Sequence, residues 1–250
     1  LAVADMGLGG TISGLVDYRA PPTGMPSANI RVKVDGLSRS GLVLSSKPID
    51  LALVSRLTAD RLDLRAVLDE DGKRRGRVQS RITGLSGAGT LTNRLRRGDL
   101  LAQLRYSGPA ASLWRLAAIE AFDLTGPLGV AANVRGTLAD PLVRGTMTSD
   151  NLRVQSALSG TDVQNVSVRG SFAGSRLRLT RFNGKTANGG TVSGSGTVDL
   201  ENLGERGPAL DIKVAANNAR LLNANGIDAT ITGPLRLISN GVGGTIAGRV

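Results

Sequence analysis

The stretch TVSGSGTVDL, at residues 191–200, decides the fold. Every second residue from Val192 to Leu200 is apolar or glycine, and the intervening residues from Thr191 to Asp199 are hydroxylated or acidic. Successive side chains of a β-strand point to opposite faces of the sheet. This alternation therefore predicts a strand with one apolar face and one polar face.

The same period of two recurs along most of the chain. In residues 128–138, LGVAANVRGTL, the apolar residues alternate with Asn133, Arg135 and Thr137. Turn sequences of the hairpin type separate such segments, among them DEDG at residues 69–72 and ANGG at residues 187–190. The sequence therefore predicts an all-β protein whose strands pair antiparallel in chain order, as a long meander.

One segment departs from this pattern. Residues 109–119, PAASLWRLAAI, are rich in helix formers and open with a proline suited to a first helical turn. We predict one short helix at about residues 110–119. Its apolar side carries Leu113, Trp114 and Leu116, which we expect to cap the apolar face of the sheet.

Composition excludes much chemistry. The chain has 250 residues with no Cys and no His, so zinc fingers, disulfides and Cys or His catalysis are ruled out. Gly184-Lys185-Thr186 resembles the end of a phosphate-binding loop, but the glycine required five positions earlier is Leu179. We therefore expect no enzymatic activity, no catalytic residue, no cofactor and no metal.

An apolar sheet face must be covered, and little helix is available for that. No linker-like segment divides the chain into sandwiches, and residues 9–16, GGTISGLV, resemble residues 243–250, GGTIAGRV. Aromatic residues make up 2% of the chain, too few for the girdles of a membrane barrel. We predict that residues 1–250 form a single repetitive segment, curled into an elongated U-shaped sheet. Its apolar face is either an open hydrophobic groove or a closed, dry core.

The residues predicted to line the groove are aliphatic and share the apolar face of their strands. They are Ile30, Val32, Val34, Leu62, Leu64, Leu68, Leu100, Leu104, Leu128, Val130, Val134, Val166, Val168, Leu177, Leu179, Val192, Val198, Leu200, Ile212, Val214, Ile227 and Ile231.

The net charge of +11 raises nucleic acid as a partner. Nucleic-acid-binding proteins interleave basic residues with aromatic stacking platforms, whereas here arginines alternate with Asp, Thr and Ser. A solvated outer face is favoured over a basic nucleic-acid-binding domain. A closed-core structural protein or an adhesin-like secreted β protein is the other alternative.

The order of several segments resembles a known family. A strand at residues 100–106, LLAQLRY, is followed by the helix with Leu113-Trp114, by DLTGPL at residues 123–128 and by GTLADPLVRG at residues 136–145. This order, and the block at residues 166–200, resemble the TamB family of translocation and assembly module subunits, of the AsmA-like superfamily and an alphaproteobacterial type. The resemblance is to the middle-to-late part of such proteins.

The resemblance implies a fold, a location and partners. The fold is the β-taco, a U-shaped sheet with a hydrophobic groove that spans the periplasm. Its implied role is outer-membrane biogenesis, by phospholipid transport between the two membranes, by assembly and secretion of outer-membrane proteins and autotransporters, or by both. The implied partners are phospholipid acyl chains, outer-membrane protein precursors and an Omp85-type, TamA-like barrel. We expect docking to that barrel, and an N-terminal inner-membrane anchor, to lie outside this chain.

Overall fold

The computed structural model of the chain describes residues 8–22, 25–39, 46–116, 122–157, 159–199, 209–224 and 226–250. Within these ranges it contains fifteen strands and two short helices. In chain order these are β1 (Leu8–Arg19), β2 (Ser27–Arg39), β3 (Ile49–Leu57), β4 (Arg61–Glu70), β5 (Lys73–Thr83), α1 (Leu91–Arg97), β6 (Asp99–Pro109), α2 (Ala110–Leu116), β7 (Asp123–Thr125), β8 (Pro127–Gly136), β9 (Pro141–Ser156), β10 (Thr161–Ala173), β11 (Arg176–Thr186), β12 (Thr191–Asp199), β13 (Ala209–Ala224), β14 (Ile227–Asn240) and β15 (Gly244–Gly248).

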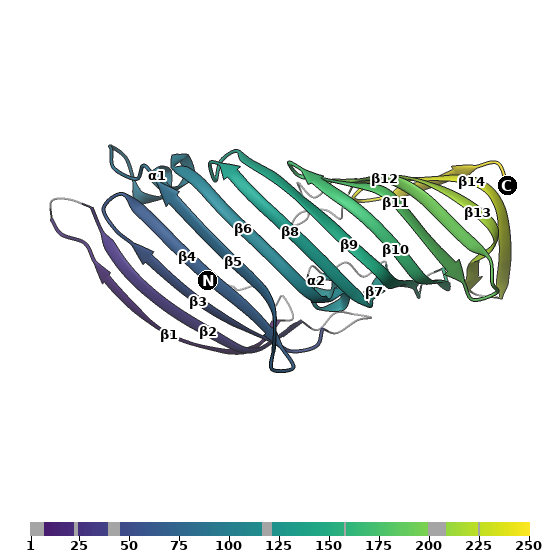
Figure 1. The fold of residues 1–250 in the computed structure, drawn as a ribbon, viewed down its shortest axis with the longest axis horizontal. Helices are drawn as coiled ribbons and strands as arrows, with labels where there is room; N and C mark the ends of the chain where they lie inside the picture. The colour runs from purple at the N-terminus through teal and green to yellow at the C-terminus, as the bar shows by residue number, and fades with distance from the viewer. Residues whose placement is uncertain are drawn as a thin grey trace. The chain divides into compact units, whose positions relative to one another are not determined.

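The strands form one open antiparallel sheet in which hydrogen-bonded neighbours follow chain order from β1 to β15. The short strand β7 is the exception, because it pairs with the second half of β9. Figure 1 shows successive strands lying side by side. The all-β fold class and the antiparallel meander are thus confirmed.

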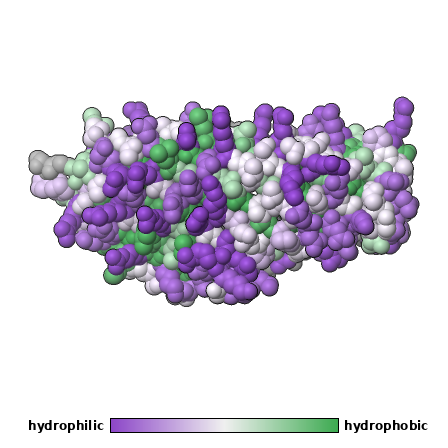
Figure 2. Space-filling model, in the orientation of Figure 1, coloured by the Kyte–Doolittle hydropathy of each residue, from purple (hydrophilic) through white to green (hydrophobic). Residues whose placement is uncertain are grey.

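The chain divides into two compact units. Unit 1 comprises Leu1–Ser40, Lys47–Ser107 and Val130–Arg144, and unit 2 comprises Gly41–Ser46, Gly108–Gly129 and Gly145–Val250. Over the strands of unit 1, long hydrophilic side chains cover much of the surface seen in Figure 2, with hydrophobic residues between them. The description of residues 1–250 as a single repetitive segment stays a prediction.

Turn chemistry fixes the strand registers. Between β4 and β5, Asp71 and Gly72 have φ of 52° and 69°, so both occupy the left-handed region that a two-residue hairpin turn requires. Between β11 and β12, Gly189 has φ of 82°, and the amide of Thr186 donates to the carbonyl of Gly190. Both turns are where the sequence predicts them.

The prediction of one helix needs a correction. Helix α2 is present over Ala110–Leu116, and residues 117–119 lie outside the described residues. A second helix, α1, spans Leu91–Arg97 and is capped by Thr90, whose hydroxyl accepts from the amide of Asn93. Seven residues are too few to produce a clear helical period in the sequence, and packing of such a short helix decides its stability.

Candidate functional site

The apolar face of unit 1 is built row by row across the strands. Val32, Leu53, Ala66, Val78 and Leu104 lie opposite one another in turn, on β2, β3, β4, β5 and β6. Every second residue along each strand joins a parallel row, so the face is mostly aliphatic over several strands. Ser55 and Ser80 interrupt the row that contains Ile30 and Leu64. The register thus brings together residues far apart in the chain.

The exposure of this row indicates how the face is covered. All five side chains of the Val32 to Leu104 row are half-buried, and so are Ile30 and Leu64 in the next row. Side chains on a sheet screen one another within a layer, whereas a second layer packed on top would bury them fully. Across this middle region the described residues supply no second layer.

One end of the same face is covered. Ala28, Leu57, Ile82 and Leu100 are buried there together with Leu85, which is 0% exposed. Leu91 and Leu95, one helical turn apart on α1, pack against this cluster. Helix α1 and the loop before it therefore close the strand ends.

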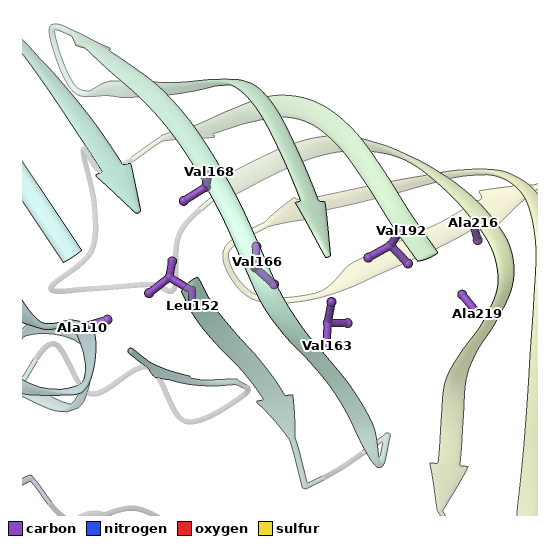
Figure 3. Close-up of a cluster of buried hydrophobic side chains, with 8 residues drawn as sticks. All are labelled: Ala110, Leu152, Val163, Val166, Val168, Val192, Ala216 and Ala219. Carbon is purple, nitrogen blue, oxygen red and sulfur yellow. The ribbon is translucent and has the colours of Figure 1, made fainter. Parts of the chain in front are cut away.

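Unit 2 contains the larger buried cluster, which is shown in Figure 3. It joins α2, β9, β10, β12 and β13, and its members are Ala110, Leu152, Val163, Val166, Val168, Val192, Ala216 and Ala219. Gly184 makes room for two of them, because a Cβ at this position would lie 2.5 Å from Val163 Cγ1 and 2.9 Å from Val166 Cγ2. The aliphatic side chains of β10 thus pack over the backbone of β11.

Hydrogen bonds show that the sheet of unit 2 curls at this end. The hydroxyl of Thr161, at the start of β10, donates to the carbonyl of Leu221 on β13 at 2.6 Å. The amide of Asn223 donates to the carbonyl of Ser159 at 2.8 Å. Because β11 and β12 lie between β10 and β13 in the ladder, these contacts require the sheet to bend back on itself. The apolar face of unit 2 is therefore closed at one end.

Away from that closure the apolar face of unit 2 is half-buried, as in unit 1. Leu179, Ile212 and Val214 are only partly covered. Gly194 accommodates the ring of Phe182, since a Cβ there would lie 2.6 Å from Phe182 Cζ. Gly194 thus permits close packing of the Phe182 ring among aliphatic neighbours.

The predicted lining residues fall into two groups, and none of those with described side chains is exposed. Five are buried: Leu100, Val166, Val168, Leu177 and Val192. Fifteen are half-buried: Ile30, Val32, Val34, Leu62, Leu64, Leu68, Leu104, Leu128, Val130, Val134, Leu179, Val198, Ile212, Val214 and Ile231. The side chains of Leu200 and Ile227 lie outside the described part of the chain. Contact with a ligand stays a prediction for all of them.

Sequence reasoning omitted several residues of the same face. Leu51 and Leu53 of β3 belong to it by register with β2, and Leu235 and Leu237 of β14 belong to it by register with β13. The alternation was visible in both segments, IDLALVSRL and GPLRLIS, so the signal was available. The apolar face is more continuous than the predicted set.

Helix α2 contacts the cluster through its first residue. Ala110 is 1% exposed and belongs to the buried cluster, whereas Leu113 and Trp114 are half-buried. The indole Nε1 of Trp114 donates to the carbonyl of Phe122 at 2.6 Å, which ties α2 to the residue before β7. The side chain of Leu116 lies outside the described residues. A capping role for Leu113, Trp114 and Leu116 stays a prediction.

The opposite face carries the charges. Cross-strand ion pairs join Arg81 to Asp63 at 2.8 Å and Arg153 to Asp162 at 2.6 Å. The hydrogen bond from Arg153 holds the pKa of the Asp162 carboxyl below its usual range, and that from Arg81 does the same for Asp63. Within the described ranges no three acidic side chains converge as a metal site would require. The charges of this face are thus held in cross-strand ion pairs.

These pKa shifts predict acid lability. A carboxyl whose pKa is lower in the folded state contributes stability that is complete above the unfolded-state pKa of about 3.9 and is lost as pH falls through the folded-state pKa. We expect the free energy of unfolding to be constant between about pH 6 and 8, where no histidine titrates, and to fall below about pH 4. Urea unfolding at a series of pH values measures this. The double variant Asp63→Asn/Asp162→Asn should show a shallower acid decline, and an equal decline would contradict the assignment.

Fold and site together define an all-β protein whose antiparallel meander carries one aliphatic face and one arginine-rich face. Residues 180–250 match the TamB C-terminal domain. This match, over the last part of the chain, supports the resemblance to the TamB family of translocation and assembly module proteins. No curated protein and no solved structure matches it. Neither helix of the described ranges has the length and apolar character needed to cross a membrane.

Proposed function

We propose that the apolar face of the sheet binds phospholipid acyl chains and lets them move along it during outer-membrane biogenesis. The observation that carries this proposal is the half-buried aliphatic surface around Val32, Leu53 and Leu104, which no second layer of the described chain covers. The protein acts without enzymatic chemistry. Its place is the periplasm, and its partner in the outer membrane is an Omp85-type, TamA-like barrel.

The chemistry of the face suits a chain that slides. Burial of each CH₂ group stabilises the bound chain by about 0.8 kcal/mol, whichever aliphatic side chain it contacts. With aromatic residues at 2% of the chain, few rings create a specific pocket. Affinity is therefore spread evenly, and no position retains the lipid more strongly than the next.

Site-specific photocrosslinking from neighbouring positions tests the proposal. A photoreactive residue at Leu53 or Ile212, both half-buried on the apolar face, is expected to form phospholipid adducts in cells. The matched controls are Ala52 and Lys213, the adjacent exposed positions on the other face, which should form few adducts. Adducts only to outer-membrane protein precursors would contradict lipid transport and indicate a chaperone role. No adducts from either inner position would indicate a closed, dry core.

A further inference from the structure

A groove of about 1890 Å³ crosses the hydrophilic face of unit 1. One wall contains Arg31, Val54 and Arg65, which lie opposite one another on β2, β3 and β4. The other wall, two residues along each strand, contains Arg56 and Asp63. Between these two rows, the lining residues belong to one row whose side chains point to the apolar face. The backbone of that row therefore forms the floor of the groove. The groove thus lies on the face of the sheet opposite the Val32 to Leu104 row.

The groove is strongly basic. Eight arginines and two aspartates line it. Asp63 is already shared by Arg61 and Arg81, at 2.7 and 2.8 Å, and Asp17 pairs with Arg19 at 3.6 Å. The other six have no carboxylate partner in the described part of the chain: Arg31, Arg56, Arg65, Arg105, Arg135 and Arg144. The groove therefore holds uncompensated positive charge.

Three of these arginines surround one point. Arg31 and Arg65 flank Val54 in the register, and Arg56 follows Val54 by two residues on the same strand. With strands roughly 4.8 Å apart and a rise of roughly 3.4 Å per residue, neighbouring Cα atoms of this triad are about 8 Å apart. Guanidinium groups on side chains of this length can converge on one phosphate and bind its oxygens in pairs.

Solvent-exposed aliphatic side chains lie beside the three arginines. Val54 is 48% exposed, Leu101 is 56% exposed and Leu15 is 73% exposed, and all three line the groove. A free phosphate would leave this surface uncovered, whereas a lipid brings a glyceryl and acyl region next to its phosphate. Nucleic acid is disfavoured because aromatic stacking residues are missing from the groove lining.

We propose that this groove binds the phosphate headgroup of an anionic phospholipid through Arg31, Arg56 and Arg65, with Val54 and Leu101 contacting the adjoining glyceryl region. The site goes beyond the proposed transport function, because it lies on the opposite face of the sheet. It gives the arginine-rich face a ligand of its own.

Vesicle flotation with the full 250-residue chain tests the proposal. The chain should float with vesicles of phosphatidylglycerol and phosphatidylcholine, more strongly than with pure phosphatidylcholine. Each arginine near an anionic surface contributes roughly fivefold in affinity, so Arg31→Gln/Arg56→Gln/Arg65→Gln should weaken binding by about 100-fold. The matched control, Arg178→Gln/Arg181→Gln/Arg249→Gln, removes the same charge from exposed positions in unit 2 and should change binding only a few-fold.

Separate outcomes would overturn the proposal. Equal losses in the two triple variants would show a response to net charge alone. Displacement by millimolar inorganic phosphate would assign the groove to free phosphate, and displacement by polyglutamate would assign it to an acidic polypeptide. Val54→Ser, at an exposed position, should weaken vesicle binding without changing the unfolding midpoint. Lipid crosslinks at Leu53 are unaffected by any of these results, so this site and the transport function fail independently.

Discussion

Replacing Val192 by aspartate is expected to unfold unit 2, with a loss of about 4 kcal/mol or more in the free energy of unfolding. Val192 is 6% exposed and lies opposite Gly184 and Ala216 in the ladder, within the cluster that closes the curled sheet. Its side chain points among Val163 and Ala219 (Figure 3). A carboxylate in that place loses its hydration and finds only aliphatic neighbours, so its charge stays uncompensated.

Guanidinium unfolding followed by circular dichroism measures the loss. Ile246→Asp is the matched control, because this aliphatic residue also sits in a strand but is 71% exposed. It should change the free energy of unfolding by no more than about 0.5 kcal/mol. If both variants lose the same small amount, the face around Val192 is hydrated and the buried cluster of unit 2 is not closed.

The strand faces were predictable because their signal is local. In TVSGSGTVDL the alternation alone places Val192 and Val198 on one face, and the register only aligns that face with its neighbours. The turn at Asp71 and Gly72 was equally predictable, because these two residue types tolerate positive φ and both have it in the structure.

The closure of unit 2 could not be predicted in this way. The contact between Thr161 and Leu221 depends on the registers of three successive strand pairs and on the curvature of the strands between them. The residues next to Thr161 and Leu221 in the sequence give no signal for this contact. Curvature is a property of the whole sheet, and small twists at each strand pair accumulate into it.

The basic groove illustrates the same limit. Arg31, Arg56 and Arg65 lie on three strands, and each of them by itself is an ordinary solvated arginine in an alternating pattern. Only the register places them around Val54 and leaves Asp63 paired elsewhere. Charge composition predicted a basic outer face, whereas the identity of a binding site on it required the paired strands.

Gly190, in the turn between β11 and β12, is the second position of large expected effect. A Cβ at Gly190 would lie 1.9 Å from the carbonyl oxygen of Asn218 and 2.7 Å from Ala219 Cα. Both are backbone atoms of β13, and Ala219 is 0% exposed, so neither can move without shifting the strand. We expect Gly190→Ala to destabilise unit 2 by about 3 kcal/mol, the upper range for overpacking.

A matched glycine separates this steric effect from the general cost of changing glycine. Gly243 has no atom within 4 Å of its ideal Cβ, so Gly243→Ala should stay within about 0.5 kcal/mol of the parent chain. Hydrogen exchange adds a local readout, because the amide of Asn223 is protected by the carbonyl of Ser159 only while the curled sheet is closed. Gly190→Ala should accelerate exchange at Asn223 more than at strand amides of β14 and β15. If the two alanine variants are equally stable, β13 does not approach this turn as closely as the backbone contact of Gly190 requires. If exchange at Asn223 is also unchanged, its amide is not protected by a closure that depends on this turn.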